Sequence, residues 1–249
     1  MTDYLTSTRK QFEYYRMLGD KTFEQLTDEQ LFWQYNEESN SIAMIVKHLW
    51  GNMLSRWTDF LATDGEKEWR QRDAEFENDI STREELINKW SAGWDRLFKA
   101  IDGLMTEDLS KEIHIRNQGH SVVEAINRQL AHYPYHVGQI VYIGKMARDA
   151  HWVSLSIPKG NSKSYNEDKF AKPKQKQHFT DELLTKSKGH RLTFFALCPY
   201  RSALRYSIFI LFTGSINADL MLWKLTVSRA IRIAVIPPTA NTHHCTGTL

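Results

Sequence analysis

The same helix-start signal occurs three times in the first part of the chain. In each copy, a Ser or Thr is followed three residues later by Glu or Gln, so both side chains can satisfy free N–H groups of a first helical turn. Apolar residues then recur at three- and four-residue steps, the period of a helix with one buried face. The pattern predicts an all-α fold. The three signals are Thr27–Gln30, Thr82–Glu85 and Ser121–Glu124.

Four long amphipathic helices are expected, with a short helix after the first signal. Helices of this length with short polar joints pack into a four-helix bundle, which we expect over residues 1–160. Residues 64–81 are charged and predict a loop, with room for one helical turn, and residues 111–116 predict a short extended connector. The expected long helices are Asp3–Leu18 with a ragged continuation through Phe23, Ser41–Leu61, a helix from the Thr82 signal to about Ile101, and Val122–Arg148; the short one is Leu31–Tyr35.

Pro134 lies inside the fourth expected helix, between two histidines. It cannot donate a hydrogen bond to the carbonyl of Leu130, which costs about 3 kcal/mol in a helix interior. We therefore expect a kink there. One interpretation is that the kink splays His132 and His136 apart, and the other is a bend that the helix tolerates.

The charge balance differs between the two ends of the chain. Residues 185–249 hold eight Lys and Arg against one acid, Asp219, which leaves 24 basic and 29 acidic residues in 1–184. That part is mildly acidic, so a nucleic-acid partner has no electrostatic support there. Hydrophobic residues make up 41% of the chain, enough for a sizeable core.

The cysteines and the N-terminus bear on location and metal chemistry. Cys198 and Cys245 both lie in the tail, so a metal site in residues 1–184 must use nitrogen and oxygen ligands. Met1–Lys10 lacks the apolar stretch of a secretory signal, and no run of 18 apolar residues occurs. We expect a cytoplasmic protein without a membrane partner.

Three histidines form a candidate metal site. His132 and His136 stand one helical turn apart, so they project from one face, and His48 lies on a polar edge of the second helix. A divalent metal bound to three imidazoles would satisfy these polar groups at the core edge, provided that the other nitrogen of each ring has a partner. The candidate partners are Asn52, Gln129 and Gln139.

The same spacing also fits histidines that hydrogen-bond one another and water without a metal. No carboxylate aligns with the site as a general base, because Glu124 lies two turns before His132 and is expected to cap its helix. We expect His114 and His151 to face solvent or lie in loops, and His120 to assist a helix start. The sequence shows no partner for the remaining four, which are His178, His190, His243 and His244.

The segment after the fourth helix is rich in turn formers and donors. Ser154–Gly160 is able to fold over the end of the bundle and present Lys159 and backbone amides to an anionic ligand. The alternative is a plain exit loop. Residues 161–184 predict a basic, weakly ordered extension.

Three segments resemble a known family, the DinB/YfiT-like superfamily: His48–Asn52, Asn127–Ile140 and Ser154–Pro158. The resemblance covers about residues 1–175 and is greatest to small bacterial proteins without an assigned function. It implies an up-down-down-up four-helix bundle, a homodimer, and a divalent metal held by His48, His132 and His136. Zinc or nickel suits three imidazoles, although the ligands alone do not separate them from iron or manganese.

The resemblance also implies a chemistry. Characterised relatives include metal-dependent transferases and isomerases that use low-molecular-weight thiols such as bacillithiol, mycothiol or glutathione. This implies thiol S-transfer to a small-molecule substrate, since a metal cation lowers the pKa of a coordinated thiol. Two alternatives stay open, a metal-dependent hydrolase using bound water and a non-catalytic metal-binding or stress protein. The lack of an aligned general base slightly favours the thiol.

The tail, residues 185–249, does not resemble the family. Its net charge is positive, whereas that of residues 1–184 is negative, and its apolar run Ser207–Phe212 lacks helix caps. We expect it to be extra coding sequence, as from a shifted reading frame, and not a selected domain. The alternative is a short membrane-associating hairpin interrupted by Asn217 and Asp219. A compact, protease-resistant fragment within residues 190–249 would refute the first idea.

Overall fold

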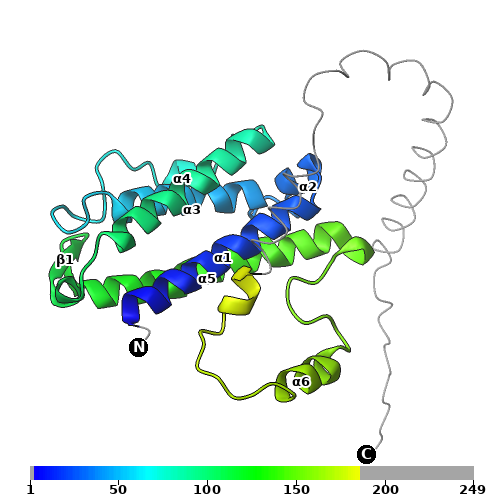
Figure 1. Cartoon of the computed structure of the whole chain (residues 1–249). Helices are drawn as coiled ribbons and strands as arrows, with labels where there is room; N and C mark the ends of the chain where they lie inside the picture. The colour runs from blue at the N-terminus through cyan, green and yellow to red at the C-terminus, as the bar shows by residue number, and fades with distance from the viewer. Residues whose placement is uncertain (1–2, 186–249) are drawn as a thin grey trace, which may run out of the picture. The chain divides into compact units, whose positions relative to one another are not determined.

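The computed structural model describes residues 3–185, so the expectations for the tail beyond residue 185 fall outside it. The described part is mainly helical, as the sequence predicts, with one small two-stranded sheet (Figure 1). Its elements in chain order are α1 (Tyr4–Gln25), α2 (Asp28–Phe32), α3 (Ile42–Trp57), η1 (Asp73–Phe76), α4 (Arg83–Asp102), η2 (Thr106–Ser110), β1 (Glu112–Ile115), β2 (Gln118–Ser121), α5 (Val122–Arg148), η3 (Asp149–His151) and α6 (Ser162–Phe170); residues 181–185 are helical as well.

The helix starts follow from side-chain caps. An oxygen on the residue before each long helix accepts a hydrogen bond from a backbone N–H of the first turn, which has no partner within the helix. The predicted start signals at Thr27, Thr82 and Ser121 are confirmed as caps. The four capping residues of the long helices are Asp3, Ser41, Thr82 and Ser121.

Helix ends differ more from expectation than helix starts. The first helix includes the expected continuation through Phe23 as regular helix and ends at Gln25, and the short helix begins at Asp28 instead of Leu31. The second long helix ends at Trp57, four residues before the expected end. Asp59, at φ 46°, has a left-handed backbone that cannot continue a right-handed helix.

Contacts between side chains fix the direction of α4 and α5 relative to α1. Arg16 donates to Asp95 at 2.8 Å, and the side chain of Arg83, at the start of α4, reaches the carbonyl of Phe23. α1 and α4 therefore run antiparallel. Tyr4 donates to Asn127 at 2.7 Å, near the start of α5, while Gln25 bonds to Val153, just beyond its end. α1 and α5 therefore run parallel.

α3 and α4 also run parallel to each other. The ammonium of Lys89 lies 4.0 Å from the ring centroid of Trp50, and Gly93 packs against Met53 one turn further along both helices. α3 is parallel to α4, α4 is antiparallel to α1, and α1 is parallel to α5. α3 and α5 are therefore antiparallel. Figure 1 shows the four long helices side by side, with the β1–β2 hairpin at the end where α1 begins.

The core between the long helices is rich in aromatic rings. Phe12, Trp94 and Tyr133 come from three different helices, with ring centroids 5.9–6.3 Å apart, and all three are 0% exposed. Burying one large apolar side chain contributes about 1.5–3 kcal/mol, so this cluster holds the helices together. The apolar stripes read from the sequence supply the surrounding core, including Ile42, Ile45, Val46, Leu49, Leu86, Trp90, Leu97, Ile101, Val122, Ile126 and Ile140.

A β-hairpin replaces the extended connector expected at residues 111–116. β1 and β2 pair antiparallel through a two-residue turn, Arg116-Asn117, with φ 57° and 59°. Both residues are left-handed, as in the type I′ turns that favour Asn. Asp64 accepts hydrogen bonds from both turn N–H groups at 2.8 Å, and Ile113 and Ile115 are buried against the core.

Residues 161–184 contain more structure than the weakly ordered extension that was predicted. They include α6, and the chain returns to α1 beyond it. His178, which had no visible partner in the sequence, lies 3.1 Å from the hydroxyl of Ser7, and Lys10 donates to Asp181 at 2.7 Å. Thr180 is fully buried beside them.

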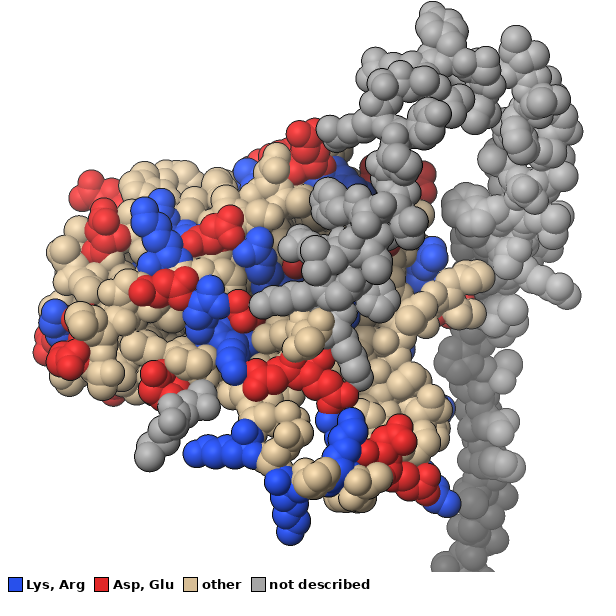
Figure 2. Space-filling model, viewed as in Figure 1, with Lys and Arg blue, Asp and Glu red and all other residues tan. Residues whose placement is uncertain are grey.

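The visible surface mixes both charges. On the face drawn in Figure 2, Lys and Arg are interspersed with Asp and Glu instead of gathering into a patch of one sign. Several are paired, such as Arg9 with Asp102. Among residues 3–185 no helix combines the length and the apolarity that a bilayer crossing demands.

Candidate metal centre

α3 and α5 bring His48, His132 and His136 together. The Nε2 atom of His132 lies 3.4 Å from Nε2 of His48 and 3.1 Å from Nε2 of His136. One nitrogen from each ring lies within 4.8 Å of the other two. α5 runs through Pro134 without interruption, and the two imidazoles converge. The splayed arrangement considered from the sequence is therefore wrong.

The spacing of these nitrogens fits a single cation. A tetrahedral zinc holds imidazole nitrogens at about 2.0–2.1 Å, which places any two of them about 3.3 Å apart. The distances of 3.4 and 3.1 Å from His132 are close to that value, and the third pair, between His48 and His136, lies within 4.8 Å, so these two rings would draw together around a bound ion. Three imidazoles leave a further coordination position for another ligand, so the residues present fit a divalent metal.

The other nitrogen of each ring faces an oxygen. Nδ1 of His48 lies 2.9 Å from a carboxylate oxygen of Glu75. Nδ1 of His132 lies 3.3 Å from the amide oxygen of Gln129, and Nδ1 of His136 lies 2.9 Å from that of Gln139. An Nδ1–H donating to each oxygen leaves a lone pair on every Nε2. Three lone pairs then point at one another, an arrangement that a cation satisfies.

The electrostatic environment keeps the α5 histidines neutral. Burial, together with the neighbouring His136 and His48, lowers the pKa of His132 to about 3. Burial also lowers the pKa of His136, although the hydrogen bond with Gln139 opposes this. A neutral imidazole is the form that binds metal, so both rings are ready as ligands at neutral pH.

Asn52 does not orient a histidine, which corrects the expectation from sequence. Its side-chain oxygen accepts a hydrogen bond from the hydroxyl of Tyr133 at 3.1 Å, and that hydroxyl accepts from the indole N–H of Trp57 at 2.9 Å. All three residues are buried. Asn52 therefore accepts a hydrogen bond from a buried tyrosine and does not orient one of the three histidines.

The partner of His48 is Glu75, which sequence reasoning missed. It is 4% exposed and lies in η1, within the segment expected to be a loop. Burial raises the pKa of its carboxyl, but hydrogen bonds with His48 and Arg70 outweigh this and the net pKa is lowered. The one available signal was Gly51, because a glycine inside a helix marks a close approach.

Aromatic rings flank the cluster. Phe76 stacks on His48 with ring centroids 4.9 Å apart, and Tyr135 contacts His136 edge-on at 5.0 Å. His48 is buried, whereas His132 is half-buried and Tyr135 is 64% exposed. The cluster is therefore reached from solvent on the α5 side.

Lys159 makes no contact that would hold it near the three histidines. Its side chain is exposed, and no hydrogen bond or ion pair joins it to another residue within 3–185. Its role as a contact for an anionic ligand stays a prediction. Of the other histidines, His114 is exposed beside Glu112, and the half-buried His120 lies in β2.

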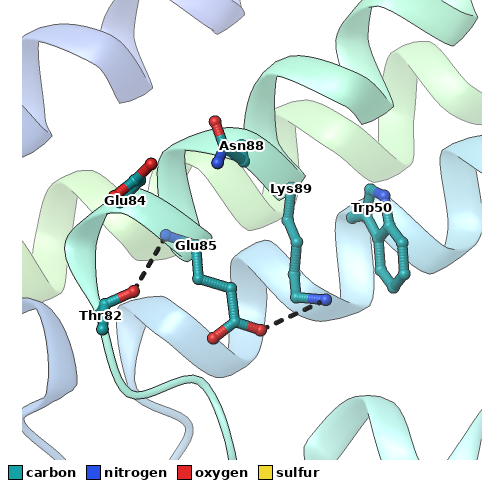
Figure 3. Close-up of a pocket in the computed structure, with 6 residues that line it drawn as sticks. All are labelled: Trp50, Thr82, Glu84, Glu85, Asn88 and Lys89. Carbon is teal, nitrogen blue, oxygen red and sulfur yellow. Dashed lines mark hydrogen bonds and ion pairs between the residues drawn. The ribbon is translucent and has the colours of Figure 1, made fainter.

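A shallow depression of about 440 Å³ lies elsewhere, between α3 and the start of α4 (Figure 3). It contains Trp50, which projects away from the side of α3 that carries His48, since two residues span about 200° of a helix. Lys89 lies over the Trp50 ring and pairs with Glu85 at 3.5 Å, and Thr82 accepts from the N–H of Glu85. These polar groups satisfy one another locally.

Residues 1–161 match a family described as "Protein of unknown function (DUF1572)". The chain belongs to this family. The match includes all of α1–α5 and the three histidines, and it ends just before α6. No curated protein and no solved structure matches the chain. The family description assigns no activity, so function has to be argued from the site.

Proposed function

We propose that this chain is a divalent-metal-dependent enzyme that transfers a low-molecular-weight thiol, such as bacillithiol, to a small electrophile. The observation that carries the proposal is the cluster of three histidine nitrogens within 4.8 Å of one another, while each Nδ1 faces an oxygen. The ligands are His48, His132 and His136, and zinc or nickel is the proposed metal.

We place the family within the DinB/YfiT-like superfamily. The helix directions support this, since α1 and α5 run one way and α3 and α4 the other, which corresponds to an up-down-down-up four-helix bundle. The histidine positions agree with the motif on which the resemblance rests. A cytoplasmic homodimer belongs to the same proposal.

The chemistry follows from the donors. A divalent cation at this site lowers the pKa of a coordinated thiol and so makes a thiolate available near neutral pH. The imidazoles bind neutral, with Nδ1–H groups held by Glu75, Gln129 and Gln139. Phe76 stacks on His48, and Tyr135 flanks His136 on the α5 side, from which the cluster is reached by solvent.

The engagement of Glu75 and Glu124 in other contacts favours thiol transfer over hydrolysis. Both oxygens of Glu75 are engaged, with Arg70 on one and with His48 and Arg70 on the other. Glu124 accepts from the N–H and hydroxyl of Ser121 and caps α5. Neither is free to take a proton from water, whereas a thiol with a metal-lowered pKa would release its proton to solvent before it attacks the electrophile.

Turnover assays separate the candidate functions. Metal-loaded wild type, His136→Ala and the exposed control Tyr142→Phe are incubated with bacillithiol or glutathione and a chromogenic electrophile. We expect a thiol adduct from wild type and Tyr142→Phe but not from His136→Ala. Hydrolysis that does not require a thiol would show that the protein is a hydrolase and not a transferase. Stoichiometric metal without turnover of any substrate tested would favour a non-catalytic metal-binding protein.

A further inference from the structure

We infer that Glu75 is a positioning residue that fixes the tautomer of His48 with hydrogen on Nδ1, so that the Nε2 lone pair faces the other two histidines. The inference rests on the proposed metal site but concerns a residue outside the three ligands. It starts from the 2.9 Å contact between Nδ1 of His48 and Oε2 of Glu75, both in buried side chains.

Glu75 differs chemically from the partners of the other two histidines. Gln129 and Gln139 are amides, which can accept a hydrogen bond through oxygen or donate one through nitrogen after a flip. A carboxylate can only accept. The hydrogen in the contact must therefore come from His48, which leaves its Nε2 as the donor atom for a metal.

Arg70 prevents the carboxylate from turning away. Its Nε donates to Oε1 at 2.7 Å and its terminal nitrogen donates to Oε2 at 2.9 Å, a two-point contact with one fixed geometry. The Arg70 side chain is 2% exposed and also lies 3.5 Å from Glu66. Glu66 in turn pairs with Arg56 and with Arg116 of the hairpin turn, each at 3.1 Å.

The backbone of α3 leaves space for this carboxylate. A Cβ atom on Gly51 would lie 2.2 Å from Oε1 of Glu75, well inside van der Waals contact. Glycine in a helix interior costs about 1 kcal/mol relative to alanine, and here it lets Glu75 approach the helix one turn from His48. Any side chain at this position must displace Glu75.

The role has a measurable consequence for metal binding. If His48 carried its hydrogen on Nε2, that nitrogen could not bind a cation until the proton moved. Loss of a group that orients a ligating histidine typically weakens metal affinity about 10–100-fold. Gly51→Ala and Glu75→Gln should both have this effect, the first by displacing the carboxylate and the second by removing its charge and adding a donor.

The first test measures Co²⁺ affinity by competition with a chelator in the full-length chain. The variants are Glu75→Gln, Gly51→Ala and the control Gly138→Ala, a helix glycine with no atom within 4 Å of an added Cβ. We expect a 10–100-fold loss in the first two and no change in the control. Wild-type affinity in Gly51→Ala and Glu75→Gln would overturn the inference.

The second test does not depend on metal. In metal-free wild type, ¹⁵N NMR should show His48 protonated on Nδ1 and bare on Nε2, and Glu75→Gln should shift that population. A His48 protonated on Nε2 in wild type would overturn the inference. Failure of wild type to bind Co²⁺ would instead overturn the proposed function, so the two failures are distinguishable.

Discussion

At the scale of single residues, hydrogen bonds inside the fold decide what each polar side chain does. The Tyr133 hydroxyl is fully buried and links Trp57 to Asn52. Burial raises the pKa of Tyr133, so the phenol stays neutral and keeps both bonds. Removing the hydroxyl leaves a buried donor and a buried acceptor without this partner.

Tyr133→Phe should therefore destabilise the fold by about 1–3 kcal/mol, the cost of unsatisfied buried polar groups. Urea unfolding at neutral pH measures the change. Tyr142→Phe, at a side chain 65% exposed, is the matched control and should stay within about 0.5 kcal/mol of wild type. Equal unfolding midpoints for the two variants would contradict this account of Tyr133.

Asp64 gives the fold a pH dependence. Burial opposes its ionisation, but hydrogen bonds from the N–H groups of Asn117, Glu66 and Arg116 lower its pKa to about 2. A carboxyl with a depressed pKa stabilises the folded state above its unfolded value of 3.8, and this contribution is lost as pH falls towards 2. Asp64→Ala should lose about 1–2 kcal/mol at neutral pH.

The difference in free energy of unfolding between wild type and Asp64→Ala should shrink between about pH 5 and about pH 2. Urea titrations at several pH values measure it. A difference that stays constant over this interval would show that the Asp64 charge does not hold the hairpin turn.

Sequence reasoning reached some of these residues and not others, for a physical reason. Gln129, His132, His136 and Gln139 follow one another at steps of three or four residues, so helix geometry alone brings neighbours in this series together. The contact of Glu75 with His48 joins residues in different elements, and helical periodicity carries no information about it. The sequence does not reveal the partner of Asn52, because the hydroxyl of Tyr133 that it binds lies on another helix.

At the scale of elements, close approach of helices depends on small residues. A Cβ on Gly19 of α1 would lie 2.3 Å from the ring of Trp90 on α4, while a Cβ on Gly138 of α5 would meet open space. The helix starts were predictable because caps and stripes are local signals. The hairpin was missed because its turn is held by Asp64, more than fifty residues away.

Substitutions at these two glycines should have opposite effects. Gly19→Ala should destabilise the fold by about 1–3 kcal/mol through overpacking against Trp90. Gly138→Ala should stabilise it by about 0.5–1 kcal/mol, because alanine favours the helix and nothing is crowded. Thermal unfolding of both variants measures the shifts, and a stabilised Gly19→Ala would contradict the packing described for α1 and α4.

At the scale of the whole described chain, two helices far apart in sequence build one site. α3 supplies His48 and α5 supplies His132 and His136, so a bound ion would tie these helices together. The long connection between α3 and α4 lets them run parallel and carries Glu75 back over α3. This path could not be read from local patterns, because residues 64–81 lack periodicity.

Metal should therefore stabilise the folded chain as a whole. A ligand present at 100 times its dissociation constant adds about 2.7 kcal/mol to the free energy of unfolding. We expect Zn²⁺ or Ni²⁺ to raise the melting temperature of wild type, and a chelator to reverse it. His48→Ala should remove the effect, and an equal rise in that variant would place the metal elsewhere.

Metal analysis of purified wild type beside His136→Ala tests the central claim most directly. After dialysis against Zn²⁺ and removal of free ion, wild type should retain about one divalent ion per chain, since three imidazoles share one cation. His136→Ala should retain almost none while its circular dichroism is unchanged. Equal metal content in both proteins, or none in wild type, would contradict the assignment of His48, His132 and His136 as a metal centre.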